Sequence, residues 1–229
     1  MNANNWGDKF SHRAMMDLAR FLTTYNMVSQ TCAADANDWD LQTAGGGDCT
    51  INGVYIPALA ADPALDINVD QVAPSNAWAQ NTVYAVDDEV YTGTLAGADQ
   101  KFWKCLKAHT ASFEAPGQDD KWQAIPNLDG MQLADDFRLY IMLTVEADGT
   151  LGAWIASAHS AIGTVPTLKI PYFDPAIYCV VGLIDYANDA ESGTVTFGLN
   201  AGAVLFSTDG TFHQVIGPVF PHPDNMPKN

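Results

Sequence analysis

The chain has 229 residues, of which 48% are hydrophobic and 16% charged, a composition typical of a folded protein with a substantial core. It is long enough for one large β domain or two smaller ones. The formal net charge of −17 at pH 7 argues against nucleic acid as a partner, because phosphate binding needs clustered lysine and arginine side chains.

The amino-terminal stretch MNANNWGDKFSHRAMM has no apolar core of the length that a secretory signal needs. No run in the chain approaches the length of a membrane span. We therefore expect a soluble protein that is made in the cytoplasm and has no membrane partner.

Residues 8–28 carry apolar side chains at helical spacing, which predicts one amphipathic helix of about five turns. The stripe consists of Phe10, Ala14, Leu18, Phe21, Leu22 and Tyr25. A lone helix of this kind must dock its stripe on another surface. Its own domain is the first expectation, and a neighbouring copy of the chain is the alternative.

The segment 29–47 is small and polar, which favours a surface loop. The acidic residues in and beside it lack the ordered alternation and terminal glutamate of a helix-loop-helix calcium site, so we expect solvated acids and no metal: Asp35, Asp38, Asp40 and Asp48. Asn52 and Gly53, between two short apolar runs, predict a tight hairpin.

The four cysteines, at 32, 49, 105 and 179, lack the paired close spacing of a zinc site. Free buried thiols are the expectation. A bridge between Cys32 and Cys49 is the alternative if the protein works outside a cell.

The stretch 78–122 is dense in aromatic residues, which indicates a small unit set inside a larger one. Strand-like runs at 82–86, 89–91 and 101–106 predict a three-stranded module that depends on its rings for burial. Four of the chain's ten basic residues lie in this unit, either on a solvated strand face or on a contact surface for an acidic glycan or a partner subunit: Lys101, Lys104, Lys107 and Lys121.

Aromatic and turn residues follow one another in this unit in the order Trp78, Asn-Thr-Val-Tyr84, Asp-Asp-Glu-Val-Tyr91, Phe102-Trp103, Pro116-Gly117 and Trp122. This order resembles that of the chitin-binding type-3 domains, which are carbohydrate-binding modules of families 5 and 12. Where that family carries adjacent tryptophans before a threonine, this chain has Lys107 to Thr110. The resemblance implies a glycan-binding role for whichever rings are exposed among Tyr84, Tyr91, Trp103 and Trp122. Trp78 and Trp122 are expected in the module's own core.

The remaining residues predict a β domain. Strand candidates separated by glycine turns lie at 137–145, 151–156, 178–186, 194–199, 203–206 and 213–219. We expect a mainly β protein with an amino-terminal helix and a sandwich-like or jelly-roll-like main domain. The predicted parts are a helix and loop arm (1–48), a discontinuous main domain (49–70 plus 127–220), the inserted module (71–126) and an extended proline-rich tail (221–229).

Catalytic motifs are missing from the sequence. It contains no G-x-S-x-G, no H-E-x-x-H, no phosphate loop and no dinucleotide fingerprint. Ser157 and His159 are close in sequence but have no recognisable nucleophile context, and the adjacent carboxylates, such as Asp87 and Asp88, point to opposite faces of an extended chain. We expect no enzyme and no cofactor.

Outside the module, the chain combines the amino-terminal helix with three stretches: TINGVYIPALAADPALDI, LYIMLTVEADGTLGAWIAS and PYFDPAIYCVVGLIDYANDAESGTVTFGLNA. This combination resembles structural proteins of tailed bacteriophage virions, of the head decoration or fibre type. It implies a symmetric, trimeric β protein that coats a particle and displays an extra domain.

Two functional hypotheses follow. The first is a non-catalytic structural protein of a phage virion, either capsid decoration or head fibre, assembled in the host cytoplasm. Its partners would be copies of itself, the major capsid protein or other virion proteins, with polysaccharide as a further candidate; a tail-associated adhesion protein is the variant of this hypothesis. The second is a carbohydrate-binding or carbohydrate-processing protein that targets chitin-like polysaccharide.

Overall fold

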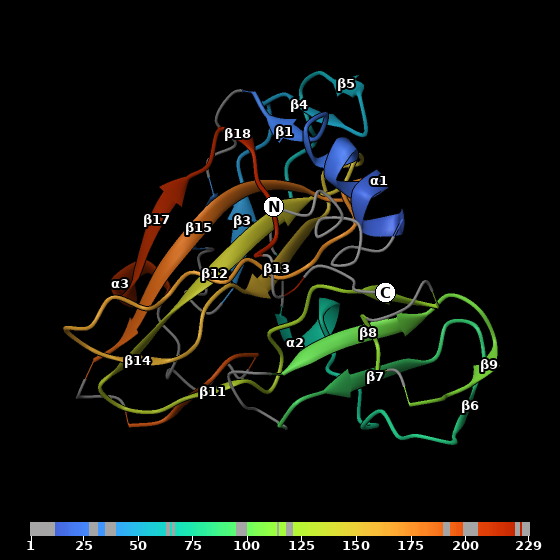
Figure 1. Ribbon diagram of the computed structural model, residues 1–229. Coiled ribbons are helices and arrows are strands. Elements are labelled where there is room, and N and C mark those ends of the chain that lie inside the picture. The colour runs from blue at the N-terminus through green and yellow to red at the C-terminus, as the bar shows by residue number, and fades with distance from the viewer. Residues whose placement is uncertain are drawn as a thin grey trace, which may run out of the picture.

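Figure 1 shows the computed structural model, which describes residues 12–27, 32–34, 40–62, 65, 67–94, 100–113, 115–117, 121–189, 193–198, 206–222 and 225. The fold is mainly β and consists of several antiparallel sheets, which confirms the predicted class. The α-helices of the described residues are α1 (His12–Phe21) and the single turns α2 (Ile67–Asp70) and α3 (Phe206–Asp209). None of these helices is both long and apolar enough to cross a membrane.

The largest sheet has the strand order β13-β12-β15-β17, and a short strand, β14, also pairs with β12. The strands are β12 (Phe137–Val145), β13 (Leu151–Ile155), β14 (Ser160–Ala161), β15 (Cys179–Asn188) and β17 (Gly210–Gln214). The predicted strands at 137–145, 151–156 and 178–186 are thereby confirmed. The turn between β12 and β13 passes through Gly149, whose φ of 97° favours glycine.

Both faces of this sheet are buried along β13, the second half of β12 and most of β15, so side chains there alternate between two apolar clusters. Ile141 and Leu143 of β12 join the first cluster, and Met142 joins the second. In β15 the alternation changes phase, since a bulge leaves Val181 without a partner opposite it in β12. Val181 and Ile184 therefore both belong to the first cluster.

A second sheet, with the order β18-β1-β4-β5, lies next to α1 (Figure 1). Its strands are β1 (Tyr25–Asn26), β4 (Cys49–Ile51), β5 (Val54–Ile56) and β18 (Gly217–Pro218). The predicted hairpin is confirmed: β4 pairs with β5, and the turn residues Asn52 and Gly53 have φ values of 49° and 78°.

The amino-terminal helix ends earlier than predicted. It stops at Phe21, and the backbone N–H of Thr23 donates to the carbonyl of Arg20 to close the last turn. Thr24 then leaves the helix, because its hydroxyl donates to the carbonyl of Pro175 at 2.7 Å and accepts from the N–H of Asn52 at 2.9 Å. The predicted start of the helix lies outside the described residues.

The region 71–126 contains a three-stranded sheet of order β10-β8-β7 and a separate pair, β6 with β9. Its strands are β6 (Val83–Tyr84), β7 (Glu89–Thr92), β8 (Lys101–Cys105), β9 (His109–Thr110) and β10 (Trp122–Ala124). All three predicted runs contain a strand. The pairing differs from the expectation, because β10 supplies the third strand of the sheet and β6 pairs with β9.

The two remaining sheets are two-stranded. They pair β2 (Cys32–Ala34) with β3 (Leu41–Thr43), and β11 (Gln132–Leu133) with β16 (Val195–Thr196). The strand predicted at 194–199 is thus short, and the one predicted at 213–219 is divided between β17 and β18. The one predicted at 203–206 lies largely outside the described residues, with Phe206 in α3. Of the predicted tail, 221–222 and 225 are described, and the N–H of His222 donates to the carbonyl of Ile170 at 2.9 Å.

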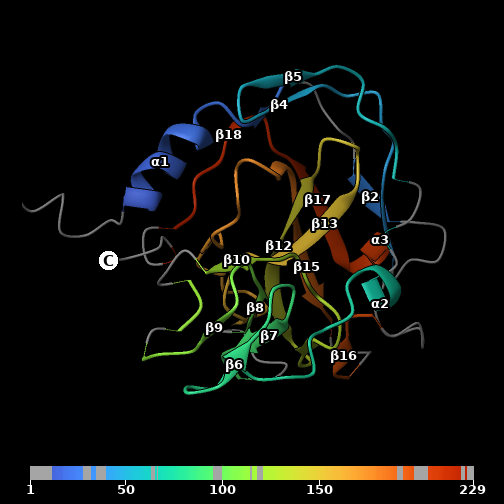
Figure 2. The same cartoon turned by 90° about the vertical axis from the view of Figure 1, so that its right-hand side faces the viewer.

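The region 71–126 packs directly on the central sheet. The second apolar cluster combines rings from this region, such as Trp103 and Trp122, with Trp154 of β13 and Tyr178 beside β15. Phe21 of α1 joins the same cluster and meets Phe173 edge to face at 4.9 Å. Figures 1 and 2 place α1, β4 and β5 toward one end of the molecule and β6, β7 and β9 toward the other.

Candidate functional site

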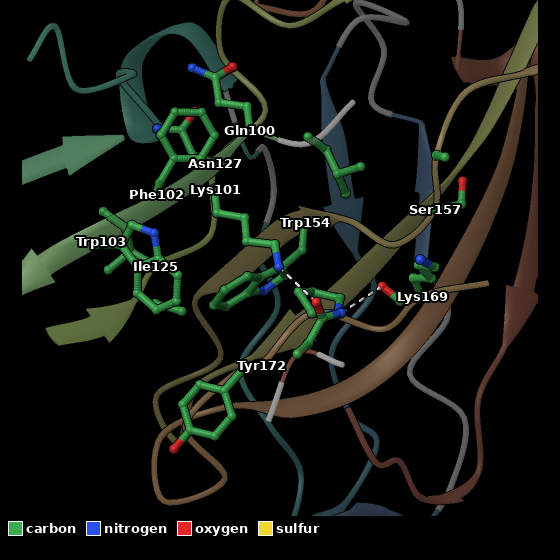
Figure 3. Close-up of a pocket in the computed structure, with 15 residues that line it drawn as sticks. Gln100, Lys101, Phe102, Trp103, Ile125, Asn127, Trp154, Ser157, Lys169 and Tyr172 are labelled. Carbon is green, nitrogen blue, oxygen red and sulfur yellow. Dashed lines mark hydrogen bonds between the residues drawn. The ribbon is translucent and has the colours of Figure 1, made fainter. Parts of the chain in front are cut away.

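A cavity of about 350 Å³ opens where the region 71–126 meets the central sheet (Figure 3). Five parts of the chain line it: the start of β8, the end of β10 with the residues that follow, the end of β13 with the loop after it, the segment 169–172, and Asn225. Antiparallel pairing sets the first wall, because Ala124 of β10 lies opposite Trp103 of β8 and the N–H of Ile125 donates to the carbonyl of Phe102.

Four aromatic residues belong to the cavity lining: Phe102, Trp103, Trp154 and Tyr172. Trp103 and Trp154 are both at least 95% buried, and each indole N–H has a partner outside the cavity. Trp103 donates to the hydroxyl of Thr92 at 2.8 Å, and Trp154 donates to that of Thr144 at 2.9 Å. These bonds fix both rings, so the indoles contribute rigid apolar surface to the cavity.

Polar groups complete the lining. Gln100, Asn127 and Ser157 are all buried, although their side chains are polar. The Oγ of Ser157 accepts from the N–H of Tyr140 at 2.7 Å, and the Oδ1 of Asn127 accepts from the N–H of Asp129 at 2.8 Å. Buried amides and hydroxyls beside ring faces are the usual means by which a cavity orients a polar ligand.

Two lysines, Lys101 and Lys169, also line the cavity. Nζ of Lys101 donates to Oδ1 of Asn225 at 2.7 Å, and Nδ2 of Asn225 donates to the carbonyl of Ile170 at 2.8 Å. Asn225 thus joins β8 to the segment 169–172 across the cavity. Figure 3 shows Lys101, Trp154 and Tyr172 around the same space.

The four aromatic residues proposed for glycan stacking occupy different environments. Tyr84 and Trp122 are buried and meet edge to face at 5.0 Å, and the hydroxyl of Tyr84 accepts from the N–H of Ala79 at 2.8 Å. Trp103 lines the cavity, and Tyr91 in β7 is half-buried. The expected core position of Trp122 is confirmed, whereas Trp78 is half-buried and packs against the second cluster.

Sequence reasoning missed Trp154, Tyr172, Asn127 and Lys169, since no local pattern distinguishes these cavity residues from core or loop positions. Sequence reasoning also did not identify Phe113 as a surface residue. In the structure, the side chain of Phe113, which lies in the region 71–126, is 90% exposed. An exposed ring inside a loop gives no periodic signal, so only the structure identifies it.

The other basic residues of the region 71–126 do not gather at the cavity. Lys104 forms an ion pair with Asp87 at 3.0 Å on an exposed surface, and Lys107 and Lys121 lie outside the lining. The carbonyl of Lys107 lies 2.7 Å from Nδ1 of His109, whose ring packs on Trp122. Of the four lysines singled out in the sequence, all of which the structure describes, Lys101 alone lines the cavity.

The four cysteines are free, so the alternative bridge between Cys32 and Cys49 is not formed. Cys49 instead shares a hydrogen bond with Cys179, which lowers the pKa of Cys49 and, together with burial, raises that of Cys179. Among the residues that the structure describes, no group of three or more histidine, cysteine or acidic side chains could hold a metal ion.

A second surface feature lies at the end of the molecule that carries α1. Apolar side chains are exposed on α1, after β1, on β5 and around β18; we call them the helix-end patch, defined as Met16, Leu18, Leu22, Met27, Val54, Tyr55, Ile216 and Phe220. An open groove lined by Leu22, Met27 and Ile216 runs through this patch. Phe21, by contrast, is fully buried, so the helix docks on its own domain and still presents apolar side chains to solvent.

Comparison with known proteins gives no relative, because no protein-family model, curated protein or solved structure matches the chain.

Proposed function

We propose that the chain is a non-catalytic structural protein of a tailed-phage virion, of the capsid decoration or head fibre type. In this proposal it forms a homotrimer, contacts the major capsid protein or another virion protein, and displays the region 71–126 on the particle. The resemblance of the β12–β13 and β15 stretches to such proteins supports it. We also retain the expectation of a sandwich-like main domain interrupted by an inserted module.

The observation that carries the proposal is the helix-end patch. Leu22 is 60% exposed and Ile216 is 64% exposed, although Phe21 at the same end of the molecule is fully buried. Leu22, Met27 and Ile216 line one open groove, and exposed apolar side chains that gather in this way mark a candidate interaction site. Burial of the exposed part of each such side chain would contribute to the free energy of association, which must also offset the lost translational and rotational freedom.

The position of the patch supports attachment and display by one molecule. α1, β4 and β5 lie toward one end, and β6, β7 and β9 lie toward the other (Figures 1 and 2). A contact made through the helix-end patch would leave the region 71–126 facing away from the particle. This arrangement suits a protein that is anchored on a lattice and meets other surfaces through its far end.

Light scattering on the full chain tests the proposal. The expected mass is three times the 24.6 kDa of one chain. Leu22→Asp should shift the protein to monomers that keep the far-ultraviolet circular dichroism spectrum of the parent, because the side chain is exposed in the monomer. The matched control is Val83→Asp at the opposite end, where valine is 75% exposed; this variant should remain trimeric. A monomeric parent chain at its highest soluble concentration would contradict the trimer.

The cavity favours a glycan-binding role as part of this function. It combines fixed indole rings with buried amides, which is the chemistry that holds a sugar. The burial of Tyr84, Trp103 and Trp122 argues against a flat, open stacking platform for insoluble chitin. A soluble glycan that enters the cavity fits the geometry better.

A further inference from the structure

Two buried thiols meet where the sheet β18-β1-β4-β5 packs on the central sheet. Cys49 belongs to β4 and Cys179 begins β15, and both residues are fully buried in the first apolar cluster. The two side chains share a hydrogen bond, although they lie far apart in the sequence. The fold therefore brings together two free thiols that no local sequence pattern connects.

The backbone around the pair holds β4 close to β15. Cys49 lies opposite Asn26 of β1, whose Nδ2 donates to the carbonyl of Val215 at 2.8 Å. The N–H of Val215 donates in turn to the carbonyl of Val181 in β15 at 3.1 Å. β4 also contacts β15 directly, and Figure 1 shows β1 and β4 at one end of the central sheet. The packing of two sheets thus places the two sulfurs side by side.

The other two cysteines lie elsewhere. Cys32 of β2 lies beside Gly182, since a Cβ added to this glycine would be 3.7 Å from the Cys32 sulfur. Cys105 belongs to the second apolar cluster, and its thiol donates to the carbonyl of Lys107 at 3.1 Å. Cys179 is therefore the partner that the structure gives to Cys49, in place of the Cys32 considered from the sequence.

We propose that Cys49 and Cys179 form a disulfide when the chain meets a low-molecular-weight disulfide such as oxidised glutathione. The hydrogen bond from Cys179 lowers the pKa of Cys49, so the Cys49 thiolate attacks first, forms a mixed disulfide and releases one glutathione thiolate. The Cys179 thiolate then attacks the Cys49 sulfur and releases the second. Two protein thiols are oxidised to one disulfide, and the small disulfide takes up their two protons and two electrons as two glutathione thiols.

The bridge would join the attachment end of the molecule to its central sheet. The hairpin that begins at Cys49 carries Val54 and Tyr55 of the helix-end patch. β1, β4, β5 and β18 have only two or three residues each, so this sheet opens more readily than the central one and admits the small disulfide. Under the proposed function, the chain would be made with free thiols in a reducing cytoplasm and would gain the bridge in an oxidising medium.

Refolding of the full chain under two redox conditions tests the proposal. The chain is unfolded in urea, which exposes both thiols, and is refolded either with dithiothreitol or with a mixture of reduced and oxidised glutathione. We expect four thiols after the first treatment and two after the second, with Cys49 and Cys179 in one bridged peptide by mass spectrometry. The bridge closes a loop of about 130 residues and should raise the melting temperature by about 10 °C or more, a gain that dithiothreitol removes.

A second route and two variants complete the experiment. Native reduced protein incubated with oxidised glutathione should form the same bridge more slowly, because both thiols are fully buried. Cys49→Ser should keep three thiols under both conditions. The matched control, Cys32→Ser, removes a thiol outside the pair and should still form the bridge, which leaves one free thiol.

Three results would overturn the inference: four free thiols by both routes, a bridge that involves Cys32 or Cys105, or a bridged protein that melts no higher than the reduced one. The inference does not depend on the particle-coating function. A monomer in light scattering would remove that function and leave the thiol pair in place, whereas a trimer without the bridge would do the reverse.

Discussion

Gly117→Ala tests how firmly the region 71–126 holds Trp103 against the cavity. Gly117 has a φ of +91°, which costs an L residue about 1–2 kcal/mol. An added Cβ would also lie 2.6 Å from Cη2 of Trp103. The ring cannot move away freely, because its N–H is bonded to Thr92 at 2.8 Å. Overpacking of this kind costs about 1–3 kcal/mol, so we expect a total loss of about 2–5 kcal/mol.

Gly163→Ala is the matched control for the cost of placing an alanine at a positive φ. Gly163 has a φ of +94°, and a Cβ added there would meet nothing within 4 Å. Urea unfolding followed by circular dichroism gives the free energy of unfolding of each variant. Gly117→Ala should be less stable than Gly163→Ala by about 1–3 kcal/mol, the overpacking term alone. Equal stabilities of the two variants would refute the claim that Trp103 is rigidly held.

Three further predictions concern buried polar and titratable groups. Thr144→Val removes the acceptor of the Trp154 N–H and should lower the free energy of unfolding in urea by about 1–3 kcal/mol. The control is Thr167→Val at an exposed position, and a loss for Thr144→Val no larger than for this control would contradict the prediction. Burial, with a smaller contribution from the Asp148 charge, raises the pKa of Glu146. The contribution of Glu146 to stability is therefore present below the ordinary glutamate pKa and is lost as pH rises through the raised pKa of the folded protein. Glu146→Gln should therefore raise the melting temperature at pH 7 and change it less near about pH 4, and an equal gain at both pH values would argue against this cause. Burial also raises the pKa of Cys32 to about 12, and the other three cysteines are fully buried. A thiol reagent at about pH 8 should therefore react slowly with the native protein and should titrate four thiols in denaturant. Fewer than four thiols in denaturant would indicate a disulfide.

Local signals predicted the long strands of the central sheet, because those strands follow alternation and turn chemistry. They failed for the segment 29–47, which was expected to be a surface loop but contains the paired strands β2 and β3. The Asn52-Gly53 turn and the long strands β12 and β15 are marked by residue types that favour them intrinsically. The end of α1 was predicted less well. Apolar spacing continues to Tyr25, but the hydroxyl of Thr24 bonds to Pro175, 151 positions away in sequence, and no local pattern reveals such a bond.

The cavity could not be predicted for the same physical reason. Its rings come from β8, β13 and the segment 169–172, and each ring sits in a pattern that fits an ordinary core position. The resemblance to carbohydrate-binding modules drew attention to Tyr84, Tyr91, Trp103 and Trp122 as a group. Whether a ring is exposed depends on the surface packed against it, and here the central sheet buries one side of the region 71–126.

The sharing of one apolar cluster between the region 71–126 and the central sheet has a mechanical consequence. Trp103 and Trp122 pack with Met142 and Trp154, so the two parts are joined by side chains as well as by the peptide chain at 71 and 126. A force applied to this region, such as drag on a molecule tethered there, reaches β12 and β13 through packed rings. The region therefore cannot swing as a separate body on its two connections, and pulling it away would expose Trp154 to water.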